Sequence, residues 1–114
     1  MKPIILPAAR DDILRQFRYY LVDQENPELA GRFLSAVRNT IEQIVRMPHA
    51  GAPKRLSREV LRGLRSWPVK KFEDVRAYYL VDKGGLRVVR VLHGKRDINR
   101  ILDRERDDTP SQAS

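Results

Sequence analysis

The sequence contains no cysteine, only two histidines and a single tryptophan. Without cysteine the chain has no disulfide, no thiolate nucleophile and no zinc site with cysteine ligands, and it suits a reducing compartment. Each histidine, His49 and His93, lacks a second His or Cys at metal-ligand spacing. We therefore expect no metal, no cofactor and no catalytic residue of the common hydrolase kinds.

Long apolar runs are also missing. No segment approaches the roughly 20 consecutive apolar residues that a membrane span needs. The apolar stretch before Pro7 is shorter than the run of about 7–15 residues in a signal peptide. We expect a cytoplasmic protein without a membrane segment.

Acidic residues are outnumbered by basic ones, 15 to 23, which gives a formal net charge of +8. Seventeen of the basic residues are arginine, which makes forked contacts to carboxylate and phosphate groups. Between Lys54 and Lys71 seven basic residues face Glu59 alone, whereas acidic residues crowd residues 103–108. This distribution fits either a soluble arginine-rich protein or a surface for an acidic partner, whether nucleic acid or polypeptide.

Two amphipathic helices are predicted near the N-terminus. The first, over Ala8–Val22, has apolar residues at one-sided helical spacing, and Asp11 and Asp12 in its first turn suit the helix dipole. These apolar residues are Ile13, Leu14, Phe17, Tyr20 and Leu21. The second begins at Asn26-Pro27-Glu28, a strong start signal, and ends before Pro48. A short link between them predicts an antiparallel helical hairpin.

Strands are predicted around and after this hairpin. Lys2–Leu6 is a short strand, and Pro48–Pro53 is a loop. Pro68 indicates a free edge or a bulge in the strand Leu64–Val69. Two alternating strands over residues 75–82 and 86–92 flank a glycine turn, with Val89 and Val91 expected on one face. Leu56–Leu61 is either a helical turn or irregular chain.

The order of elements predicts an α+β domain. An N-terminal strand and an antiparallel helical hairpin packed on a mostly antiparallel sheet of three or four strands form two layers. Asp97 is expected to cap a short C-terminal helix. We expect one domain over residues 1–106 and a disordered tail over 107–114.

Basic residues gather on the predicted strands around the only tryptophan. Trp67 is either a core anchor or an exposed contact residue, and exposed Trp and Arg often dominate interface energies. The basic residues in question are Arg65, Lys70, Lys71, Arg76, Arg87, Arg90, Lys95 and Arg96. They leave open an ordinary nucleic-acid-binding module.

Four segments in this order resemble the ParE/RelE toxin superfamily over roughly residues 2–103. They are the Pro48–Gly51 loop, Leu64–Val69, Tyr78–Asp82 and Val89–Asp97. The most specific is the last, a strand that ends in Val-Leu-His-Gly-x-Arg-Asp. The resemblance implies the toxin of a type II toxin–antitoxin system.

The superfamily divides by mechanism. RelE-like members are ribosome-dependent ribonucleases that cut mRNA with basic side chains on the sheet and a tyrosine near the C-terminus. Arg76 and Arg96 match two of the basic positions, but Trp67 and Val69 occupy the other two, and Leu102 stands where the tyrosine is expected. Ribonuclease chemistry needs groups that move protons or hold charge at the phosphate.

A shifted register that uses Lys70 and Lys71 would restore basic groups but not the tyrosine, so ribonuclease activity is the alternative. The chain is more similar to the ParE branch, which implies a non-enzymatic poison of DNA gyrase that blocks replication. The residues that we expect to bind this target are Trp67, Lys70, Lys71, Arg90, His93, Lys95 and Arg96.

The resemblance also implies a cognate antitoxin with a DNA-binding N-terminus and an acidic C-terminal segment, which together with the toxin forms a hetero-oligomer. Such a segment folds on binding and wraps a large surface. We expect it to cover the helical hairpin and an exposed sheet edge. The residues that we expect it to contact are Phe17, Tyr20, Arg65, Trp67 and Arg76.

Overall fold

A computed structural model describes residues 2–54, 62–94 and 101 of the chain. Its elements follow in the order β1 (Ile4–Ile5), α1 (Pro7–Arg18), the π-helical turn η1 (Tyr19–Asp23), α2 (Pro27–Arg46), β2 (Ala52–Pro53), β3 (Arg65–Val69), β4 (Phe72–Asp82) and β5 (Gly85–His93). No helix among these residues is both long enough and apolar enough to cross a membrane.

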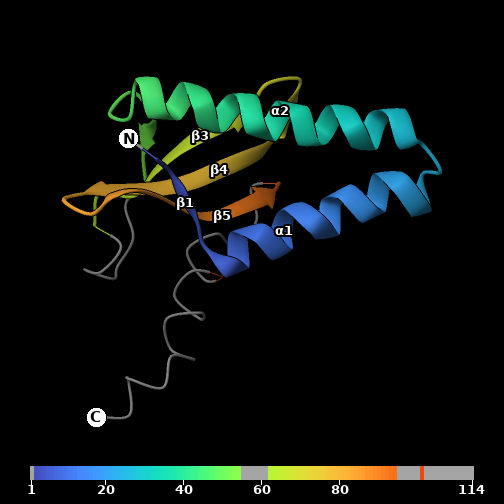
Figure 1. The fold of residues 1–114 in the computed structure, drawn as a ribbon, viewed down its shortest axis with the longest axis horizontal. Coiled ribbons are helices and arrows are strands. Elements are labelled where there is room, and N and C mark those ends of the chain that lie inside the picture. The colour runs from blue at the N-terminus through green and yellow to red at the C-terminus, as the bar shows by residue number, and fades with distance from the viewer. Residues whose placement is uncertain (1, 55–61, 95–100, 102–114) are drawn as a thin grey trace, which may run out of the picture.

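The strands form one sheet in the order β1-β5-β4-β3-β2. Pairing is antiparallel except between β1 and β5. The hairpin of α1 and α2 lies against this sheet and extends beyond it (Figure 1). This is the predicted α+β fold. The sheet has five strands rather than three or four, because β1 joins it and the predicted loop contributes β2.

Helix α2 matches the sequence prediction closely. The Asn26 side chain accepts a hydrogen bond from the Leu29 backbone N–H at 3.1 Å, and Pro27 opens the first turn. The helix ends at Arg46, before Pro48. Its buried face consists of Ala30, Phe33, Val37, Thr40, Ile41 and Ile44. The amphipathic spacing therefore fixed both the extent of α2 and the side that packs on the sheet.

Helix α1 packs only partly through the predicted face. Ile13 and Tyr20 pack against the buried core as expected. The buried residues of α1 are Ala9 and Asp12, whereas Leu14 and Leu21 are 45% and 37% exposed. The expectation that Leu14 and Leu21 point inward was wrong. The first-turn position predicted for Asp11 and Asp12 was also wrong, because the helix begins at Pro7 and has no acidic residue in its first turn. The Asp12 side chain is instead fully buried and accepts from the Val91 N–H of β5. The side of α1 that faces the sheet is therefore the side of Asp12, whose buried carboxylate needs hydrogen-bond partners, and not the side of Leu14 and Leu21.

Two irregularities interrupt the strand pairing. Pro68 lies at a register shift between β3 and β4, which confirms the bulge predicted there. In β5, Tyr79 pairs with Val88 and Tyr78 with Arg90, so that Val89 is an extra residue. Val88 and Val91 therefore belong to the core beneath the helices, while Val89 packs in a separate cluster with Tyr78. The prediction that Val89 and Val91 share a face was wrong for this reason.

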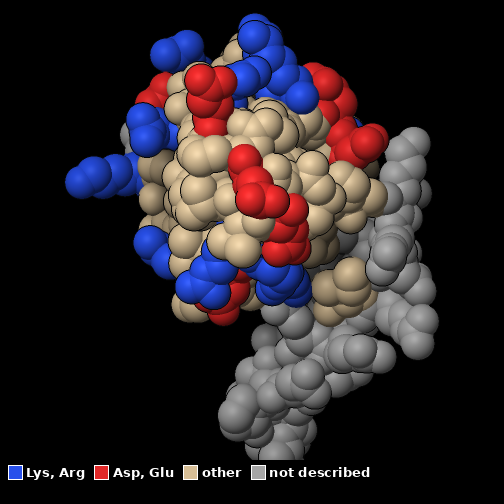
Figure 2. All heavy atoms as spheres, turned by 90° about the vertical axis from the view of Figure 1, so that its right-hand side faces the viewer, with Lys and Arg blue, Asp and Glu red and all other residues tan. Residues whose placement is uncertain are grey.

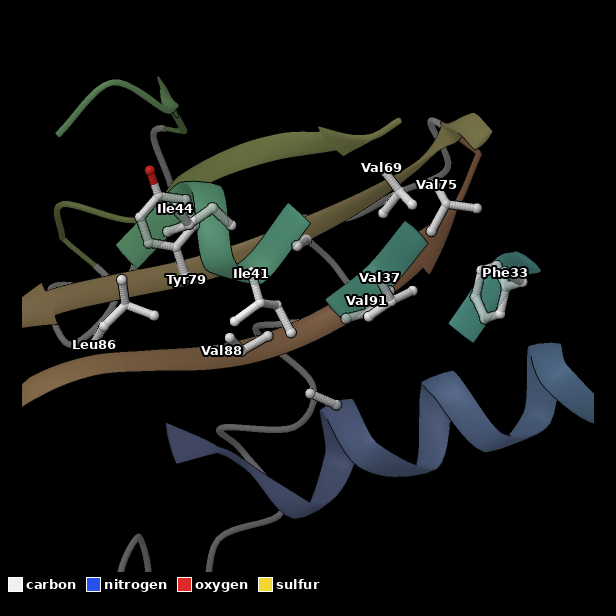
Figure 3. Packing of buried hydrophobic residues seen from close by; sticks show 12 residues of the cluster. Phe33, Val37, Ile41, Ile44, Val69, Val75, Tyr79, Leu86, Val88 and Val91 are labelled. Atoms are coloured by element: carbon white, nitrogen blue, oxygen red, sulfur yellow. The ribbon is translucent and has the colours of Figure 1, made fainter. Parts of the chain in front are cut away.

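The main core lies between the helices and the sheet. Figure 3 shows Val37 and Ile41 of α2 beside Val88 and Val91 of β5. At one end of the core, the Tyr79 hydroxyl donates to the Pro48 carbonyl at 2.9 Å and accepts from the Gly51 N–H at 3.1 Å. These bonds tie the loop after α2 to the middle of β4.

Several predicted features fall outside the described residues. They are the segment Leu56–Leu61, the basic residues Lys95 and Arg96, the Asp97 cap and the tail over 107–114. Of the predicted C-terminal helix only Ile101 is described, and it is helical.

Candidate partner-binding surface

Lys70 and Lys71 form the two-residue turn between β3 and β4, and we call this pair the lysine turn. Both lysines are exposed. Lys71 has a φ of 72°, a conformation that glycine adopts more readily. Its N–H donates to a Glu73 carboxylate oxygen at 2.7 Å, and this bond helps to hold the turn. The Lys70 N–H donates to the hydroxyl of buried Thr40 at 3.4 Å, which links the turn to α2.

A groove of about 370 Å³ lies on one side of the lysine turn. Tyr20, Lys71, Asp74 and His93 are among the residues that line it, and we call it the His93 groove. The Gly94 N–H donates to the Asp74 carbonyl at 2.7 Å, which holds the end of β5 beside the start of β4. The fold thus brings Lys71 and His93, two residues predicted to bind the target, to one groove with Tyr20.

An aromatic cluster beneath this groove positions the hairpin over the turn. The ring of Tyr20 lies 5.4 Å from that of Phe33 and 5.8 Å from that of Phe72, measured between centroids. Phe33 and Phe72 meet edge to face at 5.4 Å. Burial raises the pKa of the Tyr20 hydroxyl, and Tyr19 raises it further. Tyr20 is therefore a neutral, half-buried anchor and not a freely exposed contact.

Arg90 lies apart from the lysine turn and the His93 groove. Its Nε and Nη2 atoms donate to the two carboxylate oxygens of Asp12 at 2.7 and 2.8 Å. The Arg90 side chain is only 11% exposed, and that of Asp12 is fully buried. The geometry gives Arg90 a role in holding α1 to β5, and its predicted contact with a target stays a prediction.

The residues predicted to bind the antitoxin do not form one patch. Arg65 donates to the Gly51 carbonyl at 2.8 Å, and Trp67 is half-buried against the main core. Arg76 donates to Ser66 at 3.0 Å and alternates along β4 with the residues that pack under the helices. Phe17 is half-buried on α1. The fold therefore separates Arg76 from Arg65 and Trp67, across the two faces of the sheet.

Of the two positions at which a ribonuclease would need basic strand residues, one lies in the core and the other is half-buried against it. Val69 is fully buried, and Trp67 packs against the same cluster. Within the described part of the chain no three His, Cys, Asp or Glu residues are grouped to hold a metal ion. At the lysine turn the basic side chains are exposed, and the aromatic side chains of Tyr20 and Phe72 are half-buried.

Sequence reasoning missed Phe72 and the buried carboxylate of Asp12. Phe72 follows two lysines with no helical or alternating pattern to mark it as a core residue. Asp12 stands beside Asp11 in a helix, where an acidic pair is usually exposed. The signal for Asp12 would have been Gln16, one turn later on the same side of the helix.

The fold is similar to that of a chain in a solved structure. The structure titled "Chromosomal ParDE TA system from P. aeruginosa" contains a chain with a TM-score of 0.67 and 16% sequence identity, and the match covers 83% of this chain and 97% of that one. The model of the ParE toxin family of type II toxin–antitoxin systems matches residues 4–98, and the chain belongs to this family. A comparison with curated protein sequences finds no match.

Proposed function

We propose that this ParE-family protein is a toxin that poisons DNA gyrase in the cytoplasm, blocks replication without enzymatic activity of its own, and is neutralised by a cognate antitoxin. Family membership supports the toxin assignment. The observation that supports binding rather than catalysis is the burial of Val69 and the packing of Trp67 in the core. Apolar side chains at these two positions cannot accept a proton or stabilise charge at a phosphate.

The lysine turn and His93 are the described part of the proposed target-binding surface. Lys70 and Lys71 are exposed at one hairpin end, and His93 lines the same groove as Lys71. Lys95 and Arg96, which follow His93 in the sequence, are proposed to extend this surface. The lining of the His93 groove also includes the carboxylates of Glu73 and Asp74, so the positive charge proposed to attract a target with acidic groups or bound DNA comes from Lys70 and Lys71 of the lysine turn, with Lys95 and Arg96.

A gyrase assay with purified protein tests this proposal. We expect the chain to inhibit supercoiling and to accumulate cleaved DNA in the presence of gyrase. In cells, induced expression should cause filamentation and a DNA-damage response while bulk translation continues. Ribosome-stimulated cleavage of mRNA in a defined translation mixture, without an effect on gyrase, would refute the proposal.

The antitoxin is proposed to bind through an acidic C-terminal segment. One sheet edge is closed to strand addition, because Asp12 accepts from the Val91 N–H at 3.0 Å and Gln16 donates to the Val91 carbonyl at 2.9 Å. β1 pairs with β5 only as far as Val88, and beyond it these two side chains take the hydrogen bonds that a neighbouring strand would otherwise make. Strand addition at the Val91 edge, which the sequence left open, is therefore not part of the proposal.

Electrostatic steering offers a kinetic test of the antitoxin proposal. A partner with an acidic segment should associate faster with a chain of net charge +8 at low ionic strength than at high ionic strength. Stopped-flow association at several salt concentrations measures this effect. An association rate that does not change with salt would count against an acidic segment.

A further inference from the structure

Exposed apolar side chains gather on the outer side of the first helix. Six large apolar side chains are exposed among the described residues, and four of them lie on α1 and η1, namely Leu14, Tyr19, Leu21 and Val22. The most exposed is Val22, at 62%. Leu14, Tyr19 and Val22 line a hollow of about 730 Å³, which we call the α1 hollow. A cluster of apolar groups on the surface of a small protein commonly marks a contact with another molecule.

The π-helical turn holds the Tyr19 ring in place although the ring is exposed. The Gln24 backbone N–H donates to the Tyr19 carbonyl at 3.0 Å, and the Gln24 side-chain amide donates to the Tyr19 hydroxyl at 3.0 Å. The ring also meets that of Tyr20 edge to face at 5.4 Å. An aromatic side chain that is already ordered loses little conformational entropy when a partner covers it.

The α1 hollow carries no net charge on a strongly basic chain. The described residues that line it include two carboxylates, Asp11 and Asp23, and two guanidinium groups, Arg15 and Arg18, whereas the whole chain has a net charge of +8. Arg15 also meets buried Asp12 at 3.4 Å, but its side chain is 67% exposed. A partner of one charge sign would therefore meet repulsion as well as attraction here, and the surface that suits it carries both signs.

The charges are also ordered along the hairpin. The exposed arginines of α1 are Arg10, Arg15 and Arg18, and the exposed acidic residues at the end of the hairpin are Asp23, Glu25 and Glu28. Figure 2 shows this end of the hairpin, where acidic side chains cross an uncharged surface with Lys and Arg around it. A two-fold rotation would place the acidic end of one chain against the basic stretch of another.

We infer that the α1 hollow is the contact between two copies of this chain, which pack α1 and η1 antiparallel about a two-fold axis near Tyr19. Arg15 precedes Tyr19 by four residues and Asp23 follows it by four. Arg15 of each copy therefore faces Asp23 of the other. Tyr19 and Val22 lie between these two ion pairs, so that the contact has an apolar centre and a charged rim.

The dimer is weak, because the contact is short. From Asp11 to Asp23 the helical segment rises by roughly 18 Å at 1.5 Å per residue. One helix face of this length buries less than the roughly 800 Å² per partner of a standard interface, and we expect a dissociation constant of about 10–100 μM. No described residue lines both the α1 hollow and the His93 groove. The dimer therefore leaves the proposed target-binding surface open and does not depend on the proposed function.

Analytical ultracentrifugation of the full chain, over concentrations that span the expected constant, tests the apolar centre. Val22→Glu places a charge between the two helices, and we expect it to raise the dissociation constant of the dimer by about 10-fold or more. Met47→Glu is the matched control, because Met47 is 56% exposed, lies outside the α1 hollow and gains the same charge. We expect the control to dimerise within about twofold of wild type.

An exchange of charges tests the two-fold arrangement. Arg15→Glu and Asp23→Arg each place like charges at both ion pairs of their own dimer, so each variant alone should dimerise about 10-fold more weakly than wild type. In an equimolar mixture of the two variants, both pairs of the mixed dimer join opposite charges. We therefore expect the mixture to recover the wild-type constant within about threefold.

Three results would overturn the inference. They are a wild-type chain that stays monomeric at concentrations well above the expected constant, a dimer that Val22→Glu leaves intact, and charge variants whose mixture associates no better than either alone. Thermal melting checks every variant, since Arg15 adjoins buried Asp12. If Arg15→Glu unfolds, Val22→Glu and Asp23→Arg still decide between a dimer at this surface and none. Gyrase inhibition is measured separately, so that failure of the dimer leaves the proposed function standing.

Discussion

The carboxylate of Asp12 on α1 receives both the guanidinium of Arg90 and the backbone N–H of Val91, and its side chain has no exposed surface. Asp12 and Arg90 are 78 residues apart in the chain, and their contact joins the first helix to the last strand. The Val91 N–H lies on the edge of β5 beyond its pairing with β1, so the carboxylate accepts a hydrogen bond that no strand supplies. A single side chain thus completes both an ion pair and a sheet edge.

Removal of this carboxylate should destabilise the protein strongly. Asp12→Ala leaves the guanidinium of Arg90 with one fewer partner in a site that is nearly closed to water, and we expect the free energy of unfolding to fall by about 3 kcal/mol. Urea unfolding followed by circular dichroism measures the change. Asp82→Ala is the control, because its pair with Arg87 is exposed and should be worth about 0.5 kcal/mol. Equal losses in the two variants would contradict the structural role of Asp12.

The helical hairpin was the part of the fold that the sequence predicted best. Asn26, Pro27 and the spacing of apolar residues determine α2 by local interactions alone, so no distant partner was needed to place it. Helix α1 shows the limit of that reasoning. Its apolar pattern suggested that Leu14 points inward, whereas the choice of face depends on Asp12 and a strand encountered only 78 residues later.

The strands were predicted by position but not in register. Nothing in the alternation over residues 86–92 marks Val89 as an extra residue, because a bulge appears only when two strands are paired. The candidate surface likewise depends on contacts between segments that are distant in the sequence. Lys71 and His93 were both predicted, but the His93 groove requires Tyr20 and Phe72 to meet, and no spacing in the sequence brings them together.

Gly51 should not tolerate a side chain. A Cβ atom at this position would lie 2.1 Å from the Tyr79 hydroxyl oxygen and 2.8 Å from its ring carbon. Gly51→Ala must therefore displace the ring or the loop, and we expect a loss of about 2 kcal/mol, typical of overpacking. Adding Tyr79→Phe removes the nearest atom and should reduce the additional cost of Gly51→Ala. Strictly additive losses in the double variant would show that the two residues do not interact.

Gly31 is expected to behave in the opposite way. It lies in the interior of α2, is exposed, and has nothing within 4 Å of an added Cβ. Gly31→Ala should raise the free energy of unfolding by about 0.5–1 kcal/mol, because alanine loses less backbone entropy in a helix. Chemical denaturation measures the gain. A loss of stability would indicate that α2 is not a regular helix at this residue.

Stability should decline at alkaline pH. Burial raises the pKa of Tyr78 and Tyr79 in the folded state, against the lowering effects of Arg76 on the first and of Gly51 and Arg65 on the second. A group with a raised folded pKa contributes stability that is complete below its unfolded value, about 10 for tyrosine, and is lost as pH rises through the folded value. We expect unfolding curves to be independent of these tyrosines up to about pH 9 and to shift to lower denaturant above pH 10. Tyr79→Phe should reduce the slope of that decline, and an unchanged slope would contradict the assignment.

The final prediction concerns which residues carry toxicity. Trp67 packs against the core, so Trp67→Ala is expected to lower the free energy of unfolding by about 2 kcal/mol or more. A loss of toxicity in this variant would therefore not show that Trp67 contacts the target. Lys71→Ala and His93→Ala change exposed side chains that line the His93 groove, and we expect them to lower toxicity with little change in melting temperature. Lys83→Ala, in the turn at the other end of β4, is the matched control. Growth after induction, with gyrase inhibition by the purified variants, measures the effect. If both groove variants poison gyrase as well as Lys83→Ala does, the target does not bind at the His93 groove.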